Sequence, residues 1–285
     1  MIHIILAVLF SVFLFIVFKY FQKYNINTLQ AIIFNYLVAF VTGISISPSS
    51  ISISHIGEIH WFSYCLYLGI LFISIFFVMG QTSQKNGVSV ASVASKMSLI
   101  IPVLFALLFL KEKIDLFKII GILIALIAVY FTTKRNDISF GPSNYIYPIL
   151  LFFGSGIIDT SINYIQKTHI DSDDTGLFSA LTFLSAFLIG IGILLFQKTT
   201  NTFEFKIKNL VGGIALGIPN YFSMYFLIKA LQNDKISSAT LFTLINISVI
   251  LLTTLIGILL FKEKIQKYNY IGIAFAIIAL LLLSL

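Results

Sequence analysis

Hydrophobic residues occur along this chain in ten long stretches, and the polar and charged residues are concentrated in the short segments between them. Each stretch is close to the ~20 residues that a helix needs to cross the ~30 Å hydrocarbon core of a bilayer. The stretches cover residues 2–20, 28–46, 61–81, 87–110, 116–133, 145–165, 176–196, 208–231, 236–261 and 267–285. The pattern therefore predicts an all-α polytopic membrane protein with ten transmembrane helices.

A sequence repeat divides the predicted helices into two sets of five. Residues 108–128 (LFLKEKIDLFKIIGILIALIA) recur at 259–279 (LLFKEKIQKYNYIGIAFAIIA), a shift of 151 positions. A unit that crosses the bilayer an odd number of times leaves its second copy in the opposite orientation. The sequence therefore predicts two inverted five-helix repeats, at 1–135 and 145–285, joined by the polar segment 132–144.

The composition indicates that lipid is the solvent of most of the surface. Hydrophobic residues make up 59% of the 285 positions and charged residues only 10%, which is too apolar for a water-soluble domain of this length. The first stretch lacks a basic leader and a small-residue cleavage site, so we interpret it as a membrane span rather than a signal peptide. Cys65 is the single cysteine, which excludes an internal disulfide and a thiolate metal cluster.

The net charge of +7 comes from lysines in short loops and at helix ends, where lipid headgroups are the expected partner and nucleic acid is not. One predicted side of the membrane carries eleven basic residues: Lys19, Lys23, Lys85, Lys134, Arg135, Lys198, Lys206, Lys208, Lys262, Lys264 and Lys267. The other side carries Lys111, Lys113, Lys118, Lys167 and Lys235, while Lys96 and Lys229 lie within spans. The positive-inside rule therefore predicts that the first side is cytoplasmic and that both termini are outside.

Lys96 is the strongest candidate for a functional residue because it lies near the middle of the fourth predicted span. A lysine at the centre of a membrane helix costs at least ~2.5 to 3.5 kcal/mol on insertion scales, and this position is too deep for the side chain to reach the interface. Asp159 in the sixth span is the one acid inside a predicted span. We expect Lys96 to bind a solute carboxylate or phosphate and Asp159 to bind an ammonium group or a coupling proton. The alternative is an ion pair between the two that only holds the fourth and sixth spans together.

Neutral polar residues at similar depth complete the predicted solute-binding site: Asn163, Asn220, Tyr221 and Asn246. Asn163 follows Asp159 by one helical turn, so the two share a helix face. Each amide has an alternative role as a hydrogen-bond link between helices. Pro102 and Pro219 are expected to interrupt helices near the site, and Gly213 with Gly217 indicates close packing of the eighth span.

Nothing in the sequence indicates an enzyme or a bound cofactor. The four histidines (His3, His55, His60 and His169) lie at span ends or in loops, so no metal or haem site is predicted within the membrane. The chain has no glycine-rich phosphate loop, no metalloprotease HExxH motif and no Ser-His-Asp order. We therefore predict no catalytic residues, no metal ligands and no cofactor.

The stretches 87–114 (GVSVASVASKMSLIIPVLFALLFLKEKI) and 260–283 (LFKEKIQKYNYIGIAFAIIALLLL) resemble the EamA repeats of the drug/metabolite transporter superfamily. The resemblance implies a ten-helix bundle with a central cavity, lined by helices that include those carrying Lys96, Asp159, Asn220, Tyr221 and Asn246. The family often has a Gly-Glu pair after the fourth and ninth helices, where this chain has Lys111-Glu112 and Lys262-Glu263. We expect both acids to pair with loop lysines rather than to contact the solute. Many members of the superfamily have cytoplasmic termini, opposite to what the charge count predicts here.

These observations together predict a secondary transporter of the bacterial inner membrane that works by alternating access. Its solute is expected to be a small amino-acid-like or otherwise amphipathic metabolite, and export is the expected direction. The expected partners are this solute, membrane lipids and a coupling proton. Two alternatives remain: a translocase of a lipid-linked or nucleotide-sugar-like substrate, and a non-transporting subunit in which Lys96 and Asp159 neutralise each other.

Overall fold

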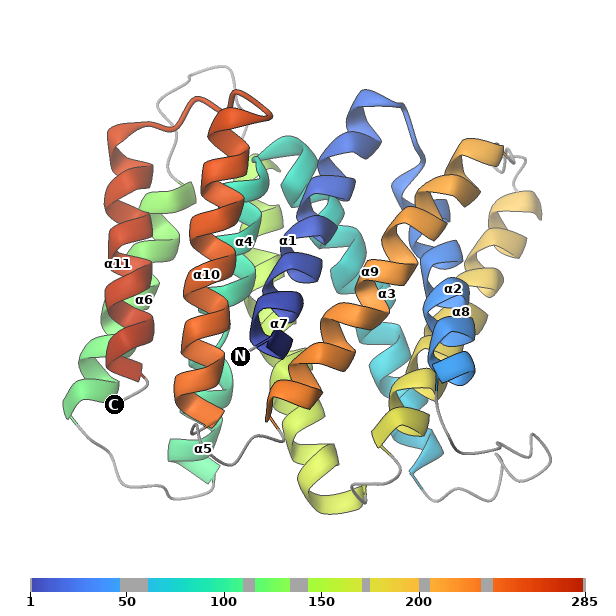
Figure 1. The fold of residues 1–285 in the computed structure, drawn as a ribbon, viewed down its shortest axis with the longest axis horizontal. Helices are drawn as coiled ribbons and strands as arrows, with labels where there is room; N and C mark the ends of the chain where they lie inside the picture. The colour runs from blue at the N-terminus through green and yellow to red at the C-terminus, as the bar shows by residue number, and fades with distance from the viewer. Residues whose placement is uncertain are drawn as a thin grey trace.

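A computed structural model describes residues 2–46, 61–109, 116–133, 143–170, 175–199, 206–231 and 238–283. Within these ranges the regular structure is entirely α-helical, as predicted. The helices are α1 (Ile2–Lys23), α2 (Thr28–Ile46), α3 (Phe62–Lys85), α4 (Val88–Met97), α5 (Ile100–Phe109), α6 (Leu116–Thr133), α7 (Ser143–His169), α8 (Thr175–Thr199), α9 (Ile207–Leu231), α10 (Ser238–Leu259) and α11 (Lys267–Leu283). They form one bundle, with α6 and α11 paired at one edge and α2 and α8 at the other (Figure 1).

The helices that precede residue 134 pack mainly against helices that follow residue 142. α1 packs on α9 and α10, while α7 packs on α3 and α4. α2 lies between α8 and α9, and α6 packs along α11. If α7 to α11 correspond in order to the first five spans, each of these pairings has its counterpart in the other half. This is the exchange of partners expected of two related five-helix units.

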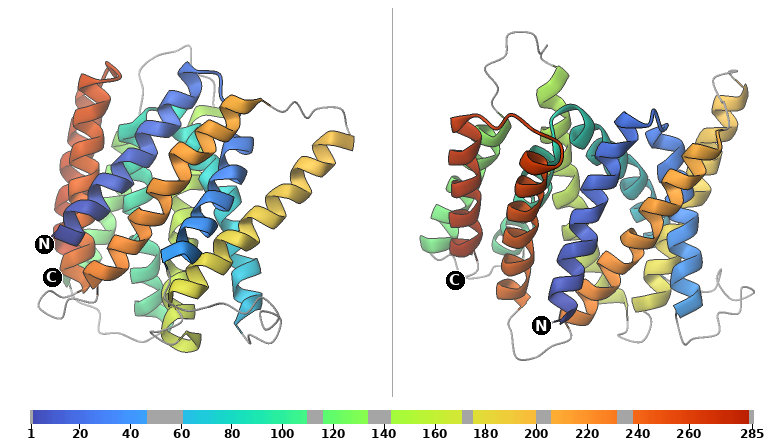
Figure 2. Two further views of the ribbon diagram at one scale, coloured as in Figure 1. Left: turned by 45° about the vertical axis from the view of Figure 1, so that its right-hand side comes forward. Right: turned by 45° about the horizontal axis from the view of Figure 1, so that its top comes forward.

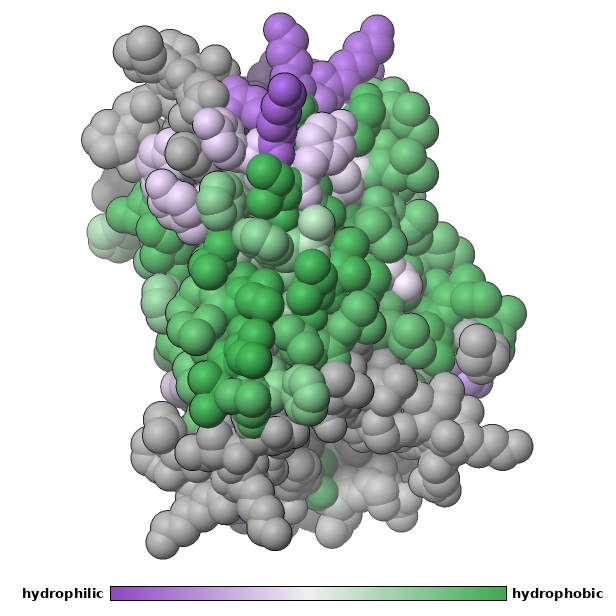
Figure 3. All heavy atoms as spheres, turned by 90° about the vertical axis from the view of Figure 1, so that its left-hand side faces the viewer, coloured by the Kyte–Doolittle hydropathy of each residue, from purple (hydrophilic) through white to green (hydrophobic). Residues whose placement is uncertain are grey.

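The surface confirms that the chain is an integral membrane protein. Six helical segments of the described residues are long and apolar enough to span a bilayer, and α4 with α5, α6, α10 and α11 contribute shorter apolar segments. Large apolar side chains are exposed around the bundle, such as Phe13, Leu123 and Leu251. On the face in Figure 3, hydrophobic side chains form a continuous band beneath a cap of hydrophilic ones. A surface of this kind requires lipid around it.

The fourth predicted span is two helices rather than one. α4 ends at Met97 and α5 begins at Ile100, with a turn at Ser98 and Leu99 between them. Pro102 explains the position of the break, because proline has no N–H to donate to the carbonyl four residues earlier. That carbonyl belongs to Ser98, and it instead accepts from the N–H of Ile101 at 2.9 Å. The expected interruption near Pro102 is therefore present.

The prediction that Pro219 interrupts a helix is wrong, since α9 is one continuous helix from Ile207 to Leu231. Gly213 and Gly217 explain how tightly this helix is held. A Cβ atom at Gly217 would lie 2.7 Å from the carbonyl oxygen of Asn35, and one at Gly213 would lie 3.0 Å from that of Ala31. The missing side chains let α9 lie against the backbone of α2, as the sequence predicted. Packing on both α1 and α2 supports α9 on either side of the proline.

The two chain ends lie at the same end of the bundle (Figure 2). The opposite end, which we call the Lys-rich end, carries most of the described basic residues: Lys19, Lys23, Lys85, Lys198, Lys206, Lys208, Lys262, Lys264 and Lys267. We expected Lys229 to lie within a span, and the structure places it elsewhere. It is exposed in the last turn of α9, at the end of the bundle that holds the termini.

Candidate functional site

Lys96 lies in the last turn of α4, directly before the break between α4 and α5. Its side chain is partly buried, and within the described residues its ammonium group forms no hydrogen bond and no ion pair. α4 is surrounded by α3, α7 and α10, so this cation lies inside the helix bundle. A charge in that position needs water or an anionic partner to be stable.

Asp159 lies on α7 and faces the interior of the bundle. The lipid-facing side of the first four turns of α7 is marked by exposed large apolar side chains: Tyr145, Ile146, Ile149, Leu150, Phe153 and Ile157. At 100° per residue, Asp159 is roughly 120° around the helix from the middle of this stripe. Its side chain is nevertheless exposed. The carboxylate is therefore exposed on a side of α7 that is turned away from the middle of the lipid-facing stripe.

Hydroxyl groups connect α7 to α4 at the level of the break. The hydroxyl of Ser98 lies 3.4 Å from the Oδ2 atom of Asp159, and it also donates to the carbonyl of Ser95 at 2.5 Å. One turn away, the hydroxyls of Ser95 and Ser155 are 3.5 Å apart. These two contacts place Asp159 beside the turn at which α4 ends.

Lys96 and Asp159 lie within electrostatic range of each other. No direct ion pair joins them in the described part of the chain. The ion pair of the purely structural interpretation is therefore not formed in this conformation. A cation and a carboxylate that are close but not joined can hold opposite charges of one solute between them.

Asn246 lies at the same depth on α10. The hydroxyl of Thr253 on α10 donates to that of Ser92 on α4 at 2.6 Å, and the two helices run antiparallel. Asn246 is seven residues from Thr253, roughly 10 Å along the axis, which brings it level with Ser98 and Leu99. Its side chain is buried, and within the described residues its amide has no hydrogen-bond partner. It is therefore available to a solute at the break.

Asn220 and Tyr221 lie elsewhere, at the contact between α9 and α2. The amide nitrogen of Asn220 donates to the Oδ1 atom of Asn35 at 3.2 Å. In this conformation Asn220 therefore links two helices, which was the alternative to binding the solute. Tyr221 is 6% exposed and packs in the core between α1, α2, α8 and α9. Asn163 lies in α7, but its side chain is outside the part that the structure describes.

The sequence contained a further signal that our prediction missed. Serines recur every three residues from the first turn of α4 to the turn that follows it, at Ser89, Ser92, Ser95 and Ser98. Each makes a polar contact: with Glu263, Thr253, Ser155 and Asp159 in that order. This spacing could have identified α4 as the most polar wall of the site.

Comparison with known proteins agrees with the fold. The sequence model of the EamA-like transporter family matches residues 1–134 and again residues 146–285. An uncharacterized protein of Haemophilus influenzae is 30% identical over 98% of this chain and 96% of its own length. The glucose uptake protein GlcU of Staphylococcus xylosus is 29% identical over 74% of this chain and 73% of its own length. A solved crystal structure with 13% identity superposes with a TM-score of 0.56 and covers 99% of this chain and 94% of its own.

Proposed function

We propose, from the premise that this chain belongs to the EamA-like transporter family, that it is a secondary transporter whose solute binds where α4 ends. The observation that carries this proposal is the pair formed by Lys96 and Asp159. The two opposite charges face the interior of a membrane protein beside a broken helix, without being joined to each other. Broken helices and ionisable groups at mid-membrane depth are typical of transport sites.

In this mechanism the two halves, 1–135 and 145–285, are inverted repeats that rock against each other around the site. Lys96 binds the anionic group of the solute, and Asn246 orients the solute from α10. Asp159 binds the cationic group or carries the coupling proton. The exchange of helix partners between the two halves supports this symmetry, because each half provides one wall of the site.

The first-choice solute is a small zwitterionic or amphipathic metabolite, since the site offers one cation and one anion. The location we propose is a bacterial inner membrane with the Lys-rich end in the cytoplasm and both termini outside, following the positive-inside rule. With the termini outside, export is movement from the Lys-rich end toward the end that holds the termini.

Uptake of a monosaccharide is the second candidate, because one relative is a glucose uptake protein. The hydroxyls of Ser95, Ser98 and Ser155, the amide of Asn246 and the carboxylate of Asp159 are groups that can hydrogen-bond a sugar. A neutral sugar has no anionic group for Lys96 to bind. A requirement for the charge of Lys96 therefore distinguishes the zwitterion candidate from the sugar candidate.

Counterflow into proteoliposomes tests both candidates. Vesicles preloaded with one unlabelled compound are diluted into its labelled form, using a panel of amino acids, other zwitterions, hexoses and nucleotide sugars. We expect a zwitterionic compound to give a transient accumulation that empty liposomes lack. Accumulation of hexoses alone would favour sugar uptake, and accumulation of nucleotide sugars alone would favour the translocase. No counterflow with any member of the panel, in a protein that is folded, would contradict the proposal.

A further inference from the structure

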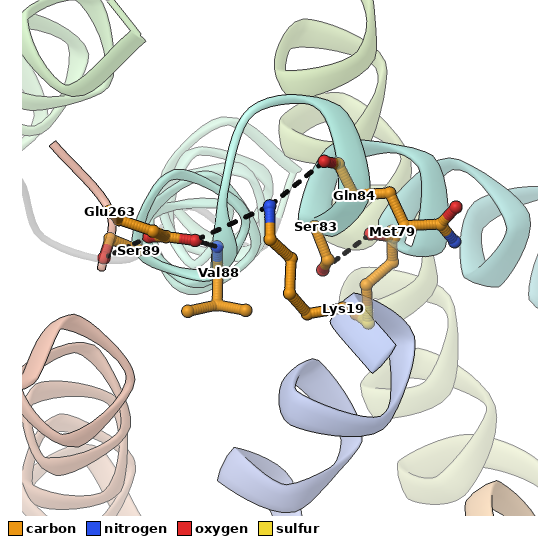
Figure 4. A network of polar contacts seen from close by, with 7 residues as sticks. All are labelled: Lys19, Met79, Ser83, Gln84, Val88, Ser89 and Glu263. Carbon is orange, nitrogen blue, oxygen red and sulfur yellow. Dashed lines mark hydrogen bonds and ion pairs between the residues drawn. The ribbon is translucent and has the colours of Figure 1, made fainter. Parts of the chain in front are cut away.

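A second carboxylate, Glu263, is held in a fitted socket at the Lys-rich end (Figure 4). Glu263 lies in the connection between α10 and α11. Its Oε1 atom accepts from the backbone N–H of Val88 at 2.8 Å, and its Oε2 atom accepts from the hydroxyl of Ser89 at 3.2 Å. Both donors belong to the first turn of α4, where the helix dipole favours a negative charge. The carboxylate thus caps α4 from a segment about 175 residues away in sequence.

Two glycines leave the space that the carboxylate fills. A Cβ atom at Gly257 would lie 2.6 Å from the Oε2 atom of Glu263, and one at Gly87 would lie 2.8 Å from the carboxylate. Gly87 also has a φ of +105°, a backbone conformation that residues with a side chain rarely adopt. On the other side, Lys262 adopts a φ of +52°, and the N–H of Glu263 donates to the carbonyl of Gly257 at 2.9 Å. The backbone on both sides is therefore shaped around this one side chain.

Lys19 brings two more helices to the socket. Its ammonium group lies 3.9 Å from the Oε1 atom of Glu263 and donates to the carbonyl of Gln84 at 3.1 Å. Lys19 belongs to the end of α1, and Gln84 to the end of α3. The side chain of Glu263 is 12% exposed. Glu263 and Lys19 together therefore join α1, α3, α4 and the connection from α10 to α11.

α4 links this socket to the proposed solute site. The helix is 10 residues long, roughly 15 Å, and a carboxylate lies at each of its ends. Glu263 binds its first turn, and Asp159 accepts from Ser98 directly after its last turn. A helix of this length moves as a rigid unit. If a bound solute shifts the C-terminal end of α4, the N-terminal end must therefore shift as well, and this end is bound to Glu263.

We infer that Glu263 is a reversible latch, which keeps the Lys-rich end closed while its carboxylate is bound to α4 and releases α4 when that end opens. This inference rests on the proposed function, since a latch needs a transport cycle. It goes further by assigning the closed end and the side chain that closes it. It also gives a reason for the acid in the Lys-Glu-Lys-Ile block of the second half: the acid binds a helix start and Lys19, so its role is not confined to pairing with loop lysines.

Spin labels across the Lys-rich end test the latch without any solute. Tyr24 at the end of α1 and Tyr270 at the start of α11 are both exposed, so cysteines replace them in a Cys65→Ala background. The protein is placed in lipid nanodiscs, and the distance between the labels is measured by pulsed electron resonance. We expect Glu263→Gln to raise the ratio of long to short separations by about tenfold or more, because hydrogen bonds to a charged group are lost. Ser89→Ala, which removes one donor, is expected to give a smaller shift in the same direction.

Lys264→Gln is the matched control, since Lys264 is exposed in the same connection and forms no hydrogen bond or ion pair within the described residues. It should leave the distances unchanged. If Glu263→Gln and Ser89→Ala lower the melting temperature but leave the distances as they were, Glu263 is a static helix cap and the latch is refuted. Because this measurement uses no solute, it remains decisive if the counterflow panel fails. Failure of counterflow with intact distance shifts would therefore count against the proposed function alone.

Discussion

Replacing Lys96 with methionine is expected to abolish solute transport while the protein remains folded in the membrane. Removing one partner of a buried charge contact costs about 2 to 5 kcal/mol of binding, which corresponds to at least about a 30-fold loss of affinity. Methionine keeps the length and apolar stem of the side chain. It also removes an insertion cost of about 2.5 to 3.5 kcal/mol for a lysine at mid-membrane depth, so the melting temperature should not fall.

Counterflow with the compound identified from the panel, together with thermal unfolding in detergent, checks this expectation. Lys96→Arg is the control, because it keeps a positive charge at the same position and should retain part of the activity. Transport by Lys96→Met within about threefold of the unaltered protein would remove Lys96 from the site. A lowered melting temperature with normal transport would instead support the structural pairing of Lys96 with Asp159.

The second large effect is expected for Asp159→Asn, which should separate exchange from accumulation. Asparagine has the same shape and can still accept from the hydroxyl of Ser98, the 3.4 Å contact of the carboxylate. It cannot carry a proton between the two sides of the membrane. Solute exchange should therefore continue, while accumulation driven by a pH gradient should fall to the level of empty liposomes.

Proteoliposomes with an imposed pH gradient distinguish these activities, since counterflow and net accumulation are measured on the same vesicles. Thr160→Val on the same helix is a suitable control, because within the described residues the hydroxyl of Thr160 bonds only to the carbonyl of Gly156, also in α7. Accumulation by Asp159→Asn at the normal rate would show that Asp159 does not carry the coupling proton.

The helices could be predicted because their apolar stretches are set by the thickness of the bilayer and carry the signal residue by residue. The position of the break in the fourth span could also be inferred, since Pro102 removes a specific backbone donor. Pro219 has the same chemistry but a different outcome. Whether a proline interrupts a helix depends on the packing around it, and the contacts of α9 with α1 and α2 involve distant parts of the sequence.

The prediction of the site was limited for a related reason. Lys96 and Asp159 are conspicuous in the sequence because a charge within an apolar stretch is costly wherever it faces. Asn220 has the same apparent depth as Asn246, yet its amide bonds to Asn35. The packing of α9 on α2 decides this, and Gly213 and Gly217 lie against the backbone of α2 at that contact. The partners of Glu263 were not predictable because Val88 and Ser89 lie in the other half of the chain.

The central claim is that water and solute reach the end of α4 within the membrane, and the reactivity of a single cysteine at position 96 tests it most directly. In a Cys65→Ser background, Lys96→Cys is treated with a membrane-impermeant thiol reagent, and Phe153→Cys on the lipid-facing stripe of α7 is the control. We predict that the cysteine at position 96 reacts readily, that the transported solute slows the reaction, and that the cysteine at position 153 stays unmodified. A cysteine at position 96 as inert as the one at position 153 would contradict the account.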